Sequence, residues 1–187
     1  MKKTISIVII LSLFFGCAPK ISLTQLTSDF TEYSALVSNG EYEKVIEFMP
    51  SEFWNVYEKK EFLTKMKKRI EKQIGSISIN NIEIEKVSKS IKSNKKYFRV
   101  IIYSSDLEFD SSNTSDKMFE NYKSTFGSEN VQLDTINKLI KIKNNKSQMI
   151  SVYEDELGEW KYLEFNPQSN TKIYGIETWE KLTKYVR

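Results

Sequence analysis

Apolar residues recur at intervals of three and four positions through the first third of the chain, a spacing that predicts helices with one buried face. Ser22 and Gln25 fit a capping box at the start of the first helix, and Asn39–Gly40 ends it. Pro50 closes a second, shorter helix, and a third runs from about 58 to 73. The apolar positions of these helices are Leu23, Leu26, Phe30, Tyr33 and Val37, then Tyr42, Val45, Ile46 and Met49, then Phe62, Leu63, Met66 and Ile70.

Beyond the third helix the apolar spacing changes to two, which predicts β-strands. Two isoleucine pairs of opposite parity alternate with polar residues there: Ile77 with Ile79, and Ile82 with Ile84. All four lie on one face only if an extra residue is inserted between the pairs. We therefore predict a β-bulge at Asn80–Asn81 and a bend in this strand.

Residues 97–105 are apolar at nearly every position, as in a strand that is covered on both faces. Further strands are predicted at 131–143, 147–155 and 159–166, with turns at Ser93–Asn94, Asn144–Asn145 and Leu157–Gly158. Two later helices are predicted after the polar loop 110–116 and at the C-terminus. Their apolar positions are Phe119, Tyr122 and Phe126, capped by Gly127, and Ile176, Trp179, Leu182 and Val186.

Helices followed by an antiparallel meander indicate an α+β fold in which helices cover a curved sheet. The stretch "LVSNGEYEKVIEFMPSEF" resembles the helix–turn–helix opening of cystatin-like, NTF2-like domains, and "GEWKYLEF" resembles their last hairpin strand. The resemblance covers residues 22–166. It implies a cone with N-terminal helices in the concavity of the sheet, to which this chain adds a C-terminal helix. We expect one α+β domain over residues 22–187.

Two lysines and an apolar run over residues 5–15 form the pattern of a signal peptide, and this run is too short to span a bilayer. Gly16–Cys17 at its end resembles the lipobox of bacterial lipoproteins. The resemblance implies a signal peptide at 1–16, acyl chains on Cys17 and a lipidated tether at 17–21. It also implies a cell-envelope protein anchored to a bacterial membrane, on the periplasmic face of the outer membrane. The alternative is a secreted protein with a free thiol.

The chain carries 28 Lys and Arg against 25 Asp and Glu, and removal of Lys2 and Lys3 leaves a charge of about +1. A balanced charge predicts no binding of nucleic acid. Cys17 is the only cysteine and the chain has no histidine, which argues against a zinc site and removes the commonest general base. We expect no cofactor and no metal.

Cone folds of this kind often enclose a pocket between helices and sheet, and pockets are the first place to expect a site. Aromatic residues could line such a pocket for a small apolar ligand. The candidates are Trp54, Tyr57, Tyr97, Tyr103, Tyr153 and Trp160, with Tyr162 beside them. The alternative is that these residues only pack the core, as large aromatic residues commonly do.

We therefore expect a non-catalytic binding or accessory module of the envelope, which takes a small apolar ligand or a protein partner. The alternative is an immunity or interaction protein that blocks its partner by surface contact. A cofactor-free isomerase or dehydratase is less favoured. It would need a carboxylate beside a tyrosine, and Asp106 and Tyr103 could share a site only across a bulge.

Two charged patterns have simple interpretations. Asp106, Glu108 and Asp110 alternate as on one strand face, but they lack the glycine and glutamate of a calcium loop, so a solvated acidic edge is expected. The third helix is rich in lysine with acids interspersed, which favours a solvated, partly paired face over one that rests on anionic lipid.

Overall fold

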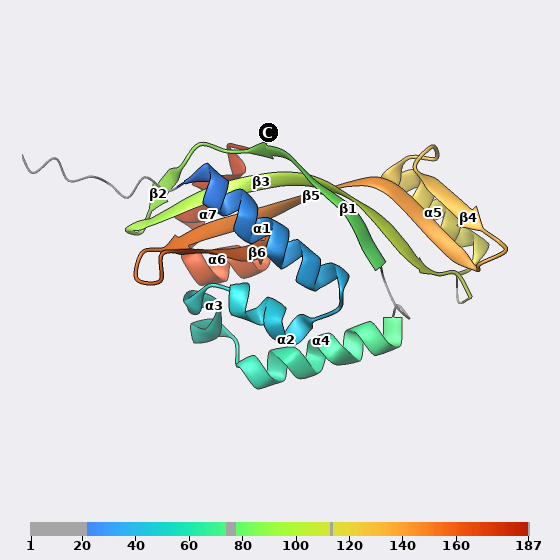
Figure 1. Ribbon diagram of the computed structural model, residues 1–187, viewed down its shortest axis with the longest axis horizontal. Helices are drawn as coiled ribbons and strands as arrows, with labels where there is room; N and C mark the ends of the chain where they lie inside the picture. Colours follow the sequence, from blue (N-terminus) through green and yellow to red (C-terminus); the bar gives the residue numbers. More distant parts are fainter. Residues whose placement is uncertain (1–21, 74–77, 113, 187) are drawn as a thin grey trace, which may run out of the picture.

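The structure is a computed structural model that describes residues 22–73, 78–112 and 114–186 (Figure 1). The helices are α1 (Leu23–Ser38), α2 (Tyr42–Val45), the 3-10 turn η1 (Ile46–Phe48), α3 (Ser51–Val56), α4 (Lys59–Gln73), α5 (Asp116–Phe126), α6 (Pro167–Tyr174) and α7 (Ile176–Thr183). The strands are β1 (Ser78–Val87), β2 (Ile91–Ser93), β3 (Lys96–Asp110), β4 (Val131–Asp134), β5 (Leu139–Glu154) and β6 (Glu159–Glu164).

These strands form one antiparallel sheet in the order β1-β3-β5-β4, with β2 paired to β3 and β6 paired to β5. The sheet is strongly curved, and α1 lies across one of its faces while α6 and α7 lie behind the other (Figure 1). Helices α2 to α4 lie beyond the edge of the sheet that β6 forms (Figure 1). The protein is therefore an α+β fold on a curved antiparallel sheet, as predicted.

Strand β3 is buried on both faces, which confirms the prediction for residues 97–105. Phe98 and Val100 face the cluster that includes α6 and α7, whereas Ile101 faces the cluster beneath α1. The first cluster contains Phe53, Ile91, Phe98, Val100, Ile150, Val152, Leu163, Tyr174 and Leu182. The second contains Leu26, Phe30, Ile101, Met149, Trp160 and Tyr162. Each fully buried large side chain contributes about 2 kcal/mol of burial energy, so the two clusters hold the layers together.

Helix α1 begins and ends where the sequence predicts. The Ser22 hydroxyl accepts a hydrogen bond from the Gln25 backbone N–H at 3.4 Å, and Gly40 after the helix adopts a φ of +70°. The other half of the capping box, a hydrogen bond between the Gln25 side chain and the Ser22 backbone N–H, was predicted wrongly. The Gln25 side chain instead donates to the Gly158 carbonyl oxygen at 2.7 Å, and so ties α1 to the turn between β5 and β6.

Two helices were not predicted. Pro50 precedes α3, whose first residue, Ser51, donates its backbone N–H at 2.8 Å and its hydroxyl at 3.0 Å to Glu154 on β5. That partner is remote in sequence, so no local pattern announces this helix. Helix α6 has a local signal, since Asn166 caps it and Pro167 occupies its first turn.

The predicted bulge in β1 is confirmed, because the pairing of β1 with β3 shifts after Asn80 and Asn81 has a φ of +51°. The predicted turn at Asn144–Asn145 is wrong. Asn144 also has a φ of +51°, but it lies in a bulge inside the continuous strand β5, and the turn before β5 is at 135–138. An Asn pair suits both a tight turn and a bulge, and the long partner β3 decides the outcome.

The Asp106 side chain bridges the two bulges. One carboxylate oxygen accepts from Asn81 Nδ2 at 2.8 Å, and the other accepts from the Asn144 backbone N–H at 3.0 Å. These hydrogen bonds hold the pKa of Asp106 below its usual range. One carboxylate on the central strand thus fixes the bends of both neighbouring strands.

Beyond the bulges, β3 and β5 extend away from the body and carry α5 and β4, at the opposite end of the long axis from the start of α1 (Figure 1). This distal extension has its own apolar cluster, made of Val131, Ile140 and Ile142 with Leu107, Phe109, Phe119, Tyr122 and Phe126. The predicted helix capped by Gly127 is confirmed as α5.

We predict that Asp106→Ala lowers the free energy of unfolding by roughly 1–2 kcal/mol at pH 7, because two charge-assisted hydrogen bonds are lost. The folded-state pKa of Asp106 is lowered, so this contribution is present above the ordinary aspartate pKa of about 3.9 and disappears as pH falls through the lower folded-state value. Urea unfolding at a series of pH values measures it. Glu83→Ala, at an exposed carboxylate on β1, is the control. An equal loss in both variants would contradict the bridging role.

Candidate functional site

A cavity of about 170 Å³ lies between α1 and the concave face of the sheet. Its apolar wall consists of Phe30, Val37, Ile79, Ile82, Leu107 and Met149. Polar side chains from α1, β3 and β5 complete the lining: Tyr33, Ser34, Tyr103, Ser105, Asn145 and Ser147. The cavity is therefore built by α1 and by the segments of β1, β3 and β5 near the bulges.

Ser34 is the least expected group in this cavity. It is only 7 % exposed, and its hydroxyl has no hydrogen-bond partner among the described residues. On the same helix, the hydroxyls of Thr27 and Thr31 bond to the carbonyl oxygens four residues earlier, at 3.0 and 2.9 Å. A buried hydroxyl without a partner costs about 1–3 kcal/mol, so this group is suited to a molecule that would enter the cavity.

A wider compartment of about 380 Å³ continues from the cavity. The two spaces share Tyr33, Tyr103, Ser147 and Met149, and the outer one adds Lys146, Gln148, Glu164 and Phe165. Lys146 is paired with Glu85 at 3.2 Å, and Glu164 is exposed at the end of β6. Of these two spaces, only the outer one has charged residues in its lining.

Glu164 also lines a third space of about 520 Å³ beside α4. Its floor is made of Val56, Tyr57, Phe62 and Met66, and Glu58, Glu61 and Lys65 lie around them. Lys65 is paired with Glu61 at 2.6 Å. We call the three spaces the inner cavity, the outer compartment and the α4 groove.

The tyrosines of the concave face keep their protons. Burial raises the pKa of Tyr33, and the neighbouring Tyr103 and Glu164 raise it further. Burial also raises the pKa of Tyr103 despite its hydrogen bond with Ser147, and that of Tyr162, whose hydroxyl donates to the Leu26 carbonyl oxygen at 3.1 Å. At neutral pH these phenols are therefore hydrogen-bond donors.

The structure does not bring the six predicted pocket residues together. Tyr103 lines the inner cavity and Tyr57 lines the α4 groove. Trp160 is 1 % exposed, packs edge to face on the half-buried Tyr153 at 5.3 Å, and borders a separate space of about 280 Å³ beside Asp29 and Phe48. Other aromatic contacts occupy the last two: Trp54 packs on Phe53 and Phe62, and Tyr97 lies beneath Lys92.

Sequence reasoning missed Ser34, although a signal for it exists. Leu26, Phe30 and Ser34 are spaced by four, so the serine continues the buried stripe of α1. A small polar residue in such a stripe marks a place where the core is not filled. Ser147, Met149 and Glu164 come from strands whose register had to be known first.

The carboxylate needed for catalysis is not where the isomerase hypothesis requires it. A bulge does separate Ser105 from Leu107, but both of these residues line the inner cavity while Asp106 is engaged with Asn81 and Asn144. Glu164, the carboxylate that acts on Tyr33 and Tyr103, is exposed.

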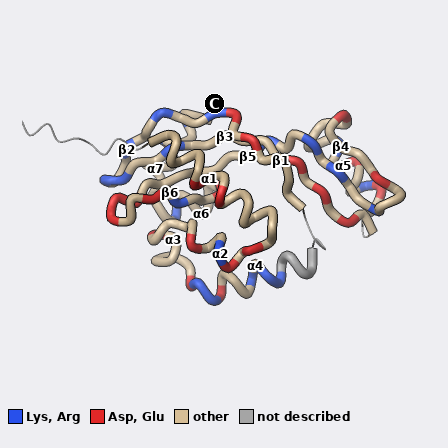
Figure 2. The backbone as a smooth tube through the Cα atoms, viewed as in Figure 1, with Lys and Arg blue, Asp and Glu red and all other residues tan. Residues whose placement is uncertain are grey.

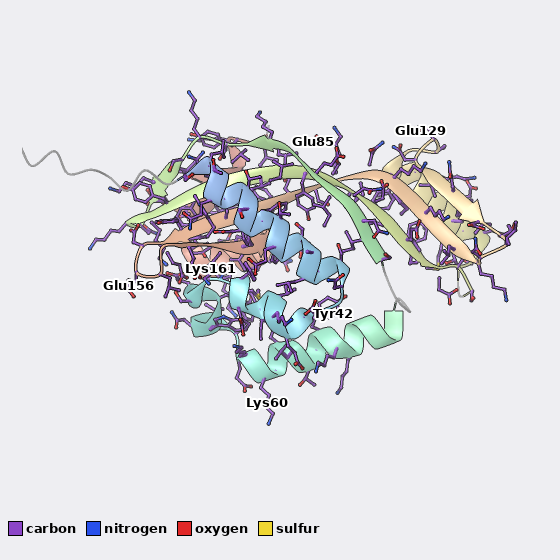
Figure 3. The ribbon with its side chains drawn as sticks, viewed as in Figure 1. Tyr42, Lys60, Glu85, Glu129, Glu156 and Lys161 are labelled. Atoms are coloured by element: carbon purple, nitrogen blue, oxygen red, sulfur yellow. The ribbon has the colours of Figure 1, made fainter. Side chains whose placement is uncertain are left out.

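The other charged patterns are also accounted for. Within residues 22–73, 78–112 and 114–186 no cluster of three or more potential ligands is placed to hold a metal ion. Basic and acidic residues alternate along the start of α4 (Figure 2). Lys67 is paired with Glu43 at 2.7 Å, whereas Lys60 extends from the outer side of the helix into solvent (Figure 3).

Cys17 and the signal-peptide pattern lie outside the described residues. Among the helices that the structure does describe, none combines the length and the apolar character needed to cross a bilayer. Comparison with protein-family models, with curated proteins and with solved structures gives no significant match to this chain.

We predict that a class of tyrosines in the native protein ionises well above the ordinary tyrosine pKa of about 10. Ultraviolet titration of native and denatured protein separates this class, and Tyr33→Phe should reduce it. Because these pKa values are raised by folding, stability is unaffected below pH 10 and falls as pH rises through the folded-state values. Coincident native and denatured titration curves would show that the phenols are not shielded.

Proposed function

We propose that this protein is a non-catalytic binding module for a small, largely apolar ligand held on the concave side of the sheet. The observation that carries the proposal is the inner cavity, whose largely apolar lining includes Ser34, a buried residue whose hydroxyl has no hydrogen-bond partner among the described residues. Most hydroxyls in a filled core bond to a nearby carbonyl, and most binding pockets combine apolar walls with a few polar groups.

The proposal includes the cystatin-like, NTF2-like cone and the envelope location expected from the sequence. The concave cavity beneath α1 supports the cone, because that fold often encloses such a pocket. The lipobox-like Gly16–Cys17 and the apolar run before it support attachment to a bacterial membrane through acyl chains. The module would then act at the periplasmic face of the outer membrane, with no role in binding nucleic acid.

A second function, blocking of a protein partner by surface contact, is favoured by the distal extension. Its exposed surface includes three large apolar side chains: Met118 on α5, Leu133 on β4 and Ile136 in the following turn. Ile136 is 90 % exposed. Several exposed apolar side chains on one part of a molecule are what a contact surface would offer a protein partner.

We predict that the full chain carrying Cys17→Ser, purified gently and studied by native mass spectrometry, carries an extra mass that is lost on denaturation. Ser34→Leu should fill the inner cavity and reduce occupancy at least about tenfold, because overpacking costs 1–3 kcal/mol. Ser28→Leu makes the same change at an exposed position of α1 and should leave occupancy unchanged. Circular dichroism checks that both variants fold.

Two results would count against this function. The first is a bare protein mass for the Cys17→Ser chain without a cavity substitution, both as purified from cells and after incubation with lipid extract. That result would favour contact with a protein partner. Equal occupancy in the Ser34→Leu and Ser28→Leu variants would place the bound molecule elsewhere.

We predict that Cys17→Ser moves the protein from the membrane fraction to the soluble fraction and abolishes incorporation of labelled fatty acid. The acyl chains anchor by burying methylene groups, each worth about 0.8 kcal/mol, and serine cannot carry the thioether. Ser28→Ala is the control. Unchanged membrane retention of the Cys17→Ser variant would refute attachment at this residue.

A further inference from the structure

We propose that the ligand enters the inner cavity by an uncharged hydrogen-bonding end, an alcohol or a carbonyl, with its apolar chain trailing outward past Tyr33 and Tyr103. The class of ligand is thus a neutral long-chain lipid, as distinct from a fatty acid or an amine. This inference rests on the proposed function and names the chemistry of the same site.

The lining of the inner cavity carries no formal charge. All its residues are apolar, hydroxyl-bearing or amide-bearing, and the lysine and glutamate of the outer compartment lie outside it. An ionised carboxylate or ammonium placed there would lose its hydration and find no opposite charge. The cost of burying an unpaired ion is large, so the lining selects against both.

The polar groups of the inner cavity match an alcohol or a carbonyl. The Ser34 hydroxyl has no partner among the described residues, and it can both donate and accept a hydrogen bond. The Tyr103 phenol stays protonated at neutral pH and bonds with Ser147, which also lines the cavity. A carbonyl oxygen would accept from these hydroxyls, and an alcohol would accept from one and donate to another.

The remaining spaces give the apolar chain a path out. The outer compartment shares Tyr33, Tyr103 and Met149 with the inner cavity. The α4 groove, which also has Glu164 in its lining, offers the apolar residues Val56, Phe62 and Met66. The lining of the outer compartment combines Met149 and Phe165 with the charged residues Lys146 and Glu164.

Calorimetric titration of the full chain carrying Cys17→Ser tests the inference with four probes of matched chain length: decanol, methyl decanoate, decanoate and decylamine. We expect decanol and methyl decanoate to bind at least about tenfold more tightly than the two charged probes at neutral pH. Methyl decanoate and decanoate share their carbonyl and differ in charge, which makes them the decisive pair.

Variants locate the polar end of the probe. Ser34→Ala and Tyr103→Phe should each weaken decanol binding about three- to tenfold through one lost hydrogen bond. Ser28→Ala, on the exposed side of α1, should change nothing. If Ser34→Ala and Tyr103→Phe both leave the preference for the neutral probes and their affinity unchanged, the inference is overturned, because the polar end of the probe would then lie elsewhere.

The two proposals fail in different ways. Decanoate binding as tightly as methyl decanoate would overturn the neutral-end inference and leave the binding function standing. Binding of none of the probes, together with a bare mass in native mass spectrometry, would overturn both, with ordered water as the occupant of the inner cavity.

Discussion

One carboxylate ties together the three strands that form the bent part of the sheet. Asp106 lies on the central strand β3 and accepts hydrogen bonds from Asn81 on one neighbour and Asn144 on the other. Both asparagines have positive φ, a conformation that needs local compensation in a residue with a side chain. Asp106 thus links the three strands at the level of their bulges, through the Asn81 side chain and the Asn144 backbone. The sheet is concave on the side that α1 covers (Figure 1).

Local patterns in the sequence predict much of this fold. The parity change between two isoleucine pairs predicted the bulge at Asn81, because a strand with one buried face cannot change parity without an extra residue. Ser22 and Gly40 marked the ends of α1 in the same direct way. The failures arise where the deciding partner is remote. Asn144 resembles a turn until β3 is known to run past it, and α3 depends on Glu154, about a hundred residues away in the chain.

The site was harder to predict than the fold, because a cavity forms where side chains are small, and small residues do not stand out in a sequence. Large aromatic residues drew attention in the sequence, yet Trp160 and Tyr153 pack against each other and do not line the inner cavity. The space exists where the buried stripe of α1 changes from Leu26 and Phe30 to Ser34. A serine at this position removes volume and adds a hydroxyl, and neither effect is visible until the opposite wall is in place. Only Tyr103 among the predicted residues belongs to that wall.

Leu107 connects the two ends of the molecule. It follows Asp106 in β3, lines the inner cavity and also packs against the apolar cluster of the distal extension. Interiors are close-packed, so this side chain cannot move toward one neighbour without changing its contact with the other. An event on the distal extension that shifts Leu107 would change the affinity of the cavity by some factor. Thermodynamic reciprocity then requires occupation of the cavity to change the strength of that distant event by the same factor.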